Sequence, residues 1–204
     1  MVSWKARGSL GGALLGAIVI AVTHPVGAAT AMKTGGVTSQ PIGHYEFCKA
    51  NIAECTVHPR NRAAARLTAE LWKQVVAVNE TVNSAIKPMN DIDIYGRDEV
   101  WAYPGAVGDC EDYVLEKRRR LMQIGLSPAD LLITVVRKWN GEGHAVLTLR
   151  TDKGDFILDN LRDDIRPWTA TGYNFLKRQA TFHTGKWVTI SEPSTVYVGS
   201  VGKN

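Results

Sequence analysis

The stretch "GDCEDYVLEKRRRL", Gly108 to Leu121, decides how this chain folds. It places Cys110 between acidic residues at the point where a helical pattern begins. Carboxylates beside a thiol disfavour the thiolate, which is the reactive form of cysteine. The neighbours of Cys110 therefore require an explanation, because the chain has only three cysteines.

Two helices are predicted from apolar residues that recur at three- and four-residue steps. The first lies within residues 59–86 and stops before Pro88. Its apolar stripe consists of Leu67, Leu71, Val75, Val78, Val82 and Ile86. The second runs from about 110 to 124, with Gly125 at its C-terminal end. Because Cys110 shares a face with Val114 and Leu121, we expect the thiol on the buried side of the first turn.

Strand-like segments follow the second helix, rich in β-branched and aromatic residues and separated by turn residues. They are 131–139, 144–150, 155–160, 185–190 and 194–200. Helices first and consecutive antiparallel strands afterwards predict an α+β fold with the helices packed on one sheet.

The N-terminal residues have the anatomy of a secretory signal peptide. Lys5 and Arg7 precede an apolar run, and Val26-Gly27-Ala28 is a plausible cleavage site. We expect a signal peptide over 1–28, a flexible lead-in over 29–43 and one domain over 44–204, in a periplasmic or secreted protein without stable membrane insertion. An uncleaved anchor or a buried helix is the alternative.

The charge of the chain does not indicate nucleic-acid binding. Without the two basic residues of the leader, the net charge of +4 falls to about +2. No stripe of basic and aromatic residues follows. The run "EKRRR", 116–120, lies inside a helical pattern and is more often a solvated face than a binding patch.

Export changes the interpretation of the cysteines, because an oxidising compartment permits disulfides. Three cysteines allow three single pairings. Cys48 and Cys55 are close enough to close a small loop, whereas Cys110 is distant in sequence, so we expect a Cys48–Cys55 disulfide and a free Cys110. A thiol at a helix N-terminus has a lowered pKa, and the same backbone N–H groups could bind an oxyanion. A buried cysteine on an apolar face is, however, more often simply packed.

His144 and Asp159 are the candidates for a base and its orienting group. His144 opens one strand and Asp159 ends the next. A loop over 150–153 would place the two directly opposite each other, within hydrogen-bonding reach. A two-residue loop at 153–154 would offset them by four residues. A histidine bonded to the backbone and an aspartate that caps a turn are the alternatives.

The order of three motifs resembles the bacterial transglutaminase-like cysteine peptidase family, which includes the LapG-type periplasmic proteases that cut surface adhesins. The motifs are "VNSAIKPMNDIDIYGRDEVWAYPGAVGDCEDYVLEKRRRL" (82–121), "GHAVL" (143–147) and "LDNL" (158–161). The resemblance runs from about Tyr45 to Trp168. It implies a papain/transglutaminase-like fold with the nucleophile at a helix N-terminus.

The resemblance also implies the roles of individual residues. Cys110 would be the nucleophile, His144 the general base and acid, and Asp159 the orienting carboxylate. Calcium would bind Asp109, Glu111 and Asp112 and cancel charge that opposes the thiolate. Calcium takes six to eight oxygens, so other groups would complete its shell. Acidic residues in a first helical turn are also stabilised by the helix dipole without a metal.

Trp101 and Pro104 match the family's approach to the cysteine. They could line the cleft, although a tryptophan before a Pro-Gly turn is more often packed.

The function expected from the sequence is thiol-dependent cleavage of a protein, if LapG-like a surface adhesin with consequences for biofilm. The resemblance also implies an inner-membrane regulatory receptor as a partner. A transglutaminase or amidase, in which an amine accepts the acyl group, uses the same residues. The third hypothesis is a calcium- or partner-binding module whose cysteine is inert.

Overall fold

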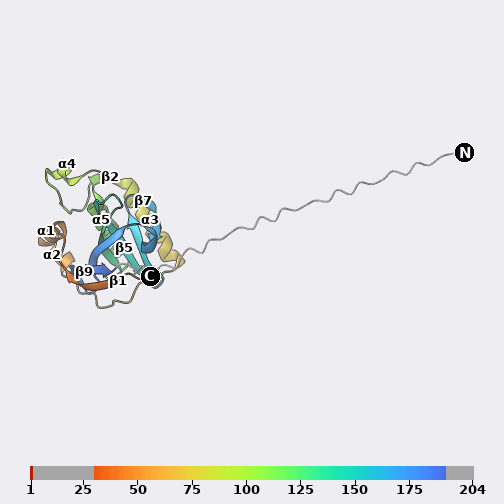
Figure 1. Ribbon diagram of the computed structural model, residues 1–204, viewed down its shortest axis with the longest axis horizontal. Coiled ribbons are helices and arrows are strands. Elements are labelled where there is room, and N and C mark those ends of the chain that lie inside the picture. Colours follow the sequence, from red (N-terminus) through yellow and green to blue (C-terminus); the bar gives the residue numbers. More distant parts are fainter. Residues whose placement is uncertain (2–29, 192–204) are drawn as a thin grey trace, which may run out of the picture.

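The computed structural model describes Met1 and residues 30–191 (Figure 1). Its helices are α1 (Ile42–Ala50), α2 (Ile52–Cys55), α3 (Ala69–Ala85), α4 (Asp91–Tyr95), α5 (Cys110–Gln123) and the short 3-10 helix η1 (Trp168–Ala170). Its strands are β1 (Lys33–Thr38), β2 (Lys87–Pro88), β3 (Val107–Gly108), β4 (Leu131–Arg137), β5 (Gly143–Thr151), β6 (Gly154–Asp159), β7 (Arg162–Pro167), β8 (Asn174–Ala180) and β9 (His183–Ser191). The expected signal peptide, 1–28, lies outside the described residues except for Met1, and the expected strand at 194–200 lies outside them entirely.

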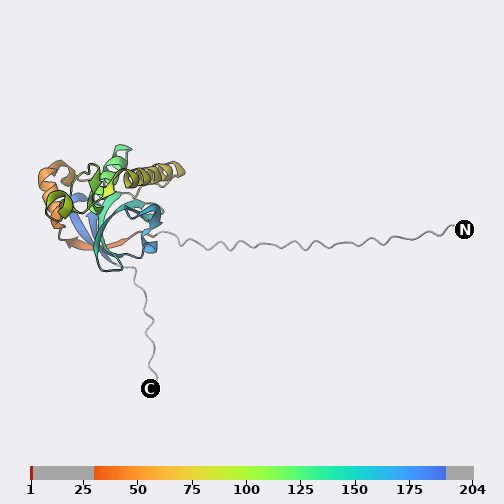
Figure 2. The ribbon, with the colours of Figure 1, turned by 90° about the horizontal axis from the view of Figure 1, so that it is seen from above.

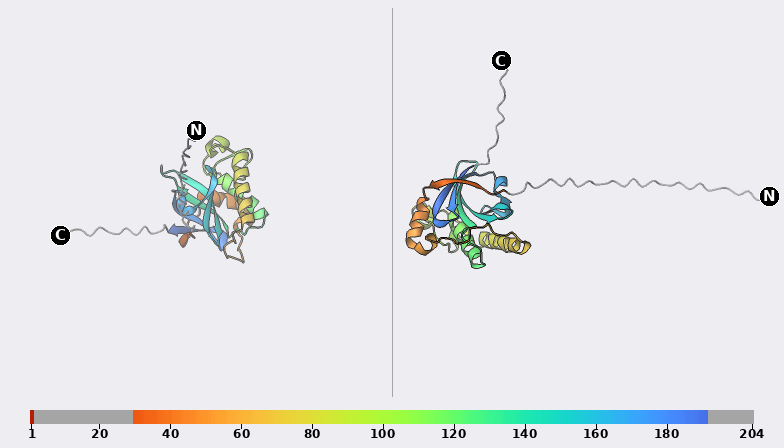
Figure 3. Two further views of the ribbon diagram at one scale, coloured as in Figure 1. Left: turned by 90° about the vertical axis from the view of Figure 1, so that its right-hand side faces the viewer. Right: turned by 90° about the horizontal axis from the view of Figure 1, so that it is seen from below.

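Within residues 30–191, seven strands form one antiparallel sheet in the order β1-β9-β8-β4-β5-β6-β7. A small parallel pair, β2 and β3, lies apart from it. Figures 2 and 3 show the helices gathered on one side of the curved sheet. The expected α+β architecture is therefore confirmed.

Helix α5 packs against the middle of the sheet, on β5 and β4, and also against α3. Its apolar side chains Val114, Leu115 and Leu121 are buried in the largest core cluster with the odd-numbered residues of β5. Gly125, which has a φ of 102°, follows the helix and turns the chain toward β4. The predicted second helix is thus confirmed, and the packing fixes Cys110 at its first residue.

Helix α3 is shorter than the sequence pattern predicts. It begins at Ala69, because the Thr68 side chain accepts a hydrogen bond from the Leu71 backbone N–H at 3.1 Å and caps the helix. Residues before the cap attach to the sheet instead. The Leu67 backbone N–H donates to Asp152 Oδ1 at 2.9 Å, and Ala65 bridges to Thr151.

The segment 29–43, expected to be a flexible lead-in, contains β1 and the start of α1. Strand β1 pairs antiparallel with β9 and forms an edge of the sheet. Its sequence, "KTGGVT", lacks the β-branched and aromatic density of the predicted strands, so pairing with β9 rather than intrinsic propensity makes it a strand. Strands β7 and β8 were not predicted either, because they too are poor in β-branched and aromatic residues.

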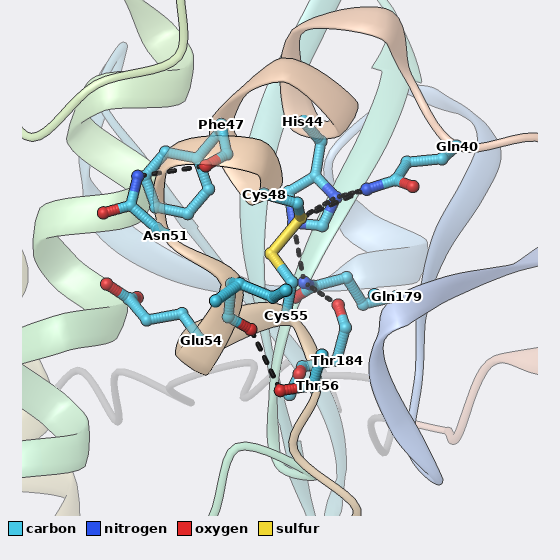
Figure 4. Close-up of a disulfide and its surroundings, with 12 residues drawn as sticks. Gln40, His44, Phe47, Cys48, Asn51, Glu54, Cys55, Thr56, Gln179 and Thr184 are labelled. Atoms are coloured by element: carbon cyan, nitrogen blue, oxygen red, sulfur yellow. Dashed lines mark hydrogen bonds between the residues drawn. A yellow bond between two sulfur atoms is a disulfide. The ribbon is translucent and has the colours of Figure 1, made fainter.

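A disulfide between Cys48 and Cys55 joins α1 to α2, as expected (Figure 4). His44 lies beside it in the core, and burial, assisted by the charge of Arg118, lowers the pKa of His44 to about 3. The indole N–H of Trp187 donates to His44 Nδ1 at 3.2 Å, so this neutral imidazole ties α1 to β9.

In the part of the chain that the structure covers, no helix has the length and apolar character needed to cross a bilayer.

Candidate active site

An open cleft of about 710 Å³ contains both Cys110 and His144. Its lining includes residues after β2 and the β4–β5 turn, where Lys138 and Glu142 form an ion pair of 2.6 Å. The β6–β7 turn, Asn160 and Leu161, also lines the cleft. The fold therefore brings two of the three predicted catalytic residues to one accessible cavity.

The third predicted residue, Asp159, lies directly behind the histidine. Its Oδ1 is 2.9 Å from His144 Nε2, and both side chains are buried. The Tyr173 hydroxyl donates to Oδ2 of the same carboxylate at 2.5 Å, and the Leu161 backbone N–H donates to Oδ1 at 3.1 Å. Burial opposes ionisation of Asp159, but hydrogen bonds from His144 and Tyr173 prevail and hold its pKa below the ordinary value.

The hairpin that forms this pair differs from both loops considered from sequence. Thr151 pairs with Gly154 and Leu147 with Leu158, so Asp152 and Lys153 form the turn. Continued one step, this register sets Asp159 opposite Val146, and His144 is its diagonal neighbour. Diagonal neighbours on one face are within reach of long side chains, which explains why the predicted contact forms although the predicted register was wrong.

The Cys110 thiol is held by two neighbours at the N-terminus of α5. It donates a hydrogen bond to Glu111 Oε2 at 2.9 Å and interacts with the backbone N–H of Ala145, the residue after His144. Burial and the negative charge of Glu111 raise the thiol pKa well above its ordinary value, and the Ala145 N–H offsets this only in part. The lowered pKa that the helix dipole predicts is therefore wrong, since desolvation and the adjacent carboxylates prevail.

Three carboxylates converge beside the thiol, but they are not the three predicted. Oxygen atoms of Asp91, Asp109 and Asp112 all lie within 4.8 Å of one another. Glu111 is not among them, because its side chain binds the Cys110 thiol instead. The carboxylate cluster thus contains two of the predicted calcium ligands, Asp109 and Asp112, together with Asp91 from α4.

The carboxylate cluster has the chemistry of a hard-cation site. Asp91 Oδ1, Asp109 Oδ1 and Asp112 Oδ2 are buried and have no hydrogen-bond partner within the described residues. Burial, together with repulsion from Glu111 and from the other carboxylates of the cluster, raises the pKa of Asp109 to about 9 and that of Asp112 to about 7. Repulsion of this kind is relieved when a cation binds, and calcium prefers such oxygen ligands. These residues therefore fit calcium, with carbonyls or water completing the shell.

Close packing of the backbone holds this cluster in place. A Cβ atom at Gly108, two residues before Cys110, would lie 2.8 Å from Asp112 Oδ2, so only glycine fits at this position. The other Asp112 oxygen, Oδ1, accepts from the Ala102 backbone N–H at 2.9 Å. Asp91 Oδ2 accepts from the Val100 backbone N–H at 2.5 Å.

Trp101 does not line the cleft with Cys110. Its ring is buried in the core against His44 and Trp187, so the packed interpretation is correct for this residue. Pro104 lies close to Gly108, outside the residues that line the cleft.

Sequence reasoning missed three residues that support the site: Asp91, Tyr173 and Asn83. The acidic run "NDIDIYGRDE" was a usable signal for Asp91. Nothing local marks the others. Tyr173 follows a turn, and Asn83 interrupts the apolar pattern of α3, from which its amide Nδ2 donates to the Asp159 and Arg162 carbonyls at 3.0 Å each.

A thiol and an imidazole–carboxylate pair that share one cleft are the components of acyl transfer by cysteine. With helices packed on an antiparallel sheet, they define a cysteine hydrolase of the transglutaminase-like class. The family model described as bacterial transglutaminase-like cysteine proteinase BTLCP matches residues 34–195, and the chain belongs to this family.

Solved structures of LapG from Legionella pneumophila are similar to this chain. One is 26% identical, with a TM-score of 0.50, and the match covers 58% of this chain and 68% of LapG. A calcium-bound LapG structure is 25% identical, with a TM-score of 0.51, over 61% of this chain and 74% of LapG. An EGTA-treated form matches at 26% identity and a TM-score of 0.50, over 59% of this chain and 68% of LapG. No curated protein sequence matches the chain.

Proposed function

We propose that this protein is an exported, calcium-dependent endopeptidase in which Cys110, His144 and Asp159 form the catalytic triad. The observation that supports this most directly is the 2.9 Å contact between His144 Nε2 and Asp159, in a histidine that lines the same cleft as the thiol. Membership of a family of cysteine proteinases supports the reaction class.

In this proposal, the two ring nitrogens of His144 have different roles. Asp159 accepts the proton of His144 Nε2–H, which leaves the lone pair of Nδ1 for the thiol proton. As Cys110 Sγ attacks the scissile carbonyl carbon, its proton passes to Nδ1 and then to the leaving amine, which departs as the peptide bond breaks. Water, deprotonated by the same nitrogen, then hydrolyses the thioester and restores the thiol. Burial and the negative charge of Glu111 raise the pKa of the Cys110 thiol, so a base that accepts the thiol proton assists the attack.

Calcium is the proposed cofactor, held by Asp91, Asp109 and Asp112. The orphaned oxygens of these residues support the assignment, as does the existence of a calcium-bound form of the similar LapG. Bound calcium would supply positive charge that lowers the pKa of the neighbouring thiol. Glu111 remains the hydrogen-bond acceptor of the thiol in this scheme.

The substrate class follows from the relatives and from the leader-like N-terminus. An apolar run behind Lys5 and Arg7 supports export to the periplasm, where the substrate would be a surface protein such as an adhesin, with an effect on biofilm. A regulatory receptor in the inner membrane is the corresponding proposed partner. The basic "KRRR" of α5 gives no indication of an adhesin-binding surface, so the substrate rests on the relatives rather than on a feature of this chain.

A peptide probe with a thiol-directed warhead tests the triad. The wild-type protein should be labelled at Cys110 in calcium, whereas Cys110→Ala should not be labelled and His144→Ala should react far more slowly. All proteins should keep the Cys48–Cys55 disulfide and the same melting temperature. Equal labelling of Cys110→Ala would refute the assignment of the nucleophile.

Two further measurements define the reaction. A labelled primary amine, supplied with a cleaved peptide, should not be incorporated if water is the acyl acceptor, and stoichiometric incorporation would establish a transferase instead. Proteomics of surface proteins from cells with wild-type or Cys110→Ala protein should reveal new N-termini that depend on the thiol.

A further inference from the structure

A second hollow of about 600 Å³ adjoins the cleft that contains Cys110. It lies between the C-terminal half of α3 and the β6–β7 turn, and we call it the distal hollow. Its lining consists of Glu80, Thr81, Asn83, Ser84 and residues 160–163. Asn160 and Leu161 belong to both cavities, so the two are continuous across this turn.

The shared turn is held rigidly with respect to the imidazole–carboxylate pair. The Leu161 backbone N–H donates to Asp159 Oδ1 at 3.1 Å, and Asn83 Nδ2 holds the Asp159 carbonyl from the opposite side at 3.0 Å. The Leu161 side chain is nevertheless 56% exposed, at the boundary between the cavities. An extended polypeptide that lies over Cys110 would cross this apolar side chain and enter the distal hollow.

The hollow offers mainly hydrogen-bond acceptors. Glu80 and Asp163 contribute exposed carboxylates, whereas the Oδ1 atoms of Asn83 and Asn160 are buried, so a ligand in the hollow does not reach them. The donor side of Asn83 is already occupied, because its Nδ2 donates to Asp163 Oδ1 at 3.0 Å as well as to backbone carbonyls. Acceptors of this kind complement a ligand with several N–H donors.

The basic groups near the hollow do not neutralise it. Arg162 gives its guanidinium to Asp164, with contacts of 2.7 and 3.1 Å, and Asp164 also pairs with Arg166. Lys117 lies beneath Asp163 in α5, but burial lowers the pKa of Lys117 to about 7, so its charge is only partly present at neutral pH. Two carboxylates, of Glu80 and Asp163, and one guanidinium, of Arg162, line the hollow, so its lining carries a net charge of one negative unit.

We propose that the distal hollow is a substrate subsite for a basic side chain, arginine or lysine, located several residues to one side of the cleaved bond. The proposal rests on the proposed endopeptidase function and names a feature of its substrate. Glu80 and Asp163 would pair with the cation, and Leu161 would contact the intervening residues. Glu80 would be a specificity-determining residue that does not take part in the chemistry.

The experiment uses quenched fluorescent peptides with an alanine- and glycine-rich sequence. A single arginine is placed at each position in turn, and each peptide is matched by one with uncharged citrulline. The full protein in calcium should cleave the peptide with arginine at one particular distance roughly fivefold more efficiently than its citrulline partner, as expected for an ion pair in a partly solvated site. Glu80→Gln should abolish this ratio, and Glu80→Lys should reverse it. Glu70→Gln, an exposed acid on the first turn of the same helix, is the matched control and should leave the ratio unchanged.

The possible outcomes separate this proposal from the proposed function. Cleavage without an arginine preference, or with a preference that survives Glu80→Gln, would overturn the subsite and leave the peptidase intact. If no peptide is cleaved and the thiol probe does not label Cys110, both proposals fail. If the probe labels Cys110 but no peptide is cleaved, the binding affinities of the same peptides for Cys110→Ala test the subsite. Tighter binding of the arginine peptide than of its citrulline partner supports the subsite if Glu80→Gln removes the difference. Equal affinities for the two peptides overturn it.

Discussion

Replacing Lys117 with methionine should stabilise this protein by roughly 2 kcal/mol more at pH 7 than at pH 9. The Lys117 side chain is 0% exposed, and Nζ has no hydrogen-bond partner in the described part of the chain. Burial lowers its pKa from 10.5 to about 7, even though the carboxylates of Asp159 and Asp163 act in the opposite direction. Methionine has the same unbranched length and no charge to desolvate.

The magnitude follows from the linkage between protonation and folding. Between the folded pKa of about 7 and the unfolded pKa of 10.5, the unfolded chain binds more protons, so the free energy of unfolding increases with pH in this window. One pKa unit corresponds to about 1.4 kcal/mol, so the buried lysine costs roughly 4 kcal/mol at pH 7. About half of that, roughly 2 kcal/mol, is recovered by pH 9.

Urea unfolding at pH 7, 8 and 9, in constant calcium, measures this effect. The stability advantage of Lys117→Met over wild type should shrink by roughly 2 kcal/mol from pH 7 to pH 9. Other titrating groups, including the carboxylate cluster, are common to both proteins and cancel in the difference. Lys73→Met, at an exposed position of α3, should show no such trend. A difference between Lys117→Met and wild type that does not change with pH would refute a buried, partly neutral lysine.

Three further outcomes are expected. Calcium is expected to raise the melting temperature; Asp91→Asn should abolish this increase, whereas Glu111→Gln should retain it. The opposite result would contradict the proposed ligand set of Asp91, Asp109 and Asp112. Tyr173→Phe should reduce kcat for peptide cleavage roughly tenfold with little change in KM, because the Asp159 carboxylate loses a hydrogen bond of about 1.5–3 kcal/mol. An unchanged kcat would show that this hydrogen bond is dispensable. Replacing Cys48 and Cys55 with serine should lower the free energy of unfolding by roughly 2–3 kcal/mol, as expected for so short a loop. Urea unfolding curves that coincide with those of the wild type would show that the disulfide does not stabilise the fold.

The sequence predicted those parts of the fold that are encoded locally. Helix α5 and strands β4, β5 and β6 carry clear periodicity, and all four were located to within a few residues. Strand β1 escaped prediction because it contains two adjacent glycines and depends on β9 for its conformation.

The site shows the same division between local and distant information. His144 and Asp159 belong to one hairpin, so their contact survived an error in the turn. Asp91 reaches the carboxylate cluster from a separate helix, and Tyr173 reaches Asp159 from beyond β7, so only tertiary structure places them. Glu111 was assigned to the metal because it is adjacent in sequence, but its side chain turns toward the thiol.

The attachment of the N-terminal strand has a practical consequence for expression and processing. Met32 is 5% exposed, its backbone N–H donates to Asp155 Oδ2 at 2.9 Å, and the Thr30 carbonyl accepts from the Trp168 indole at 2.8 Å. A mature chain that begins after Ala28 preserves these anchors. A truncation that begins at residue 44 would remove β1 and leave the backbone N–H and C=O groups of β9 unpaired at the edge of the sheet. Such an exposed edge favours self-association between molecules.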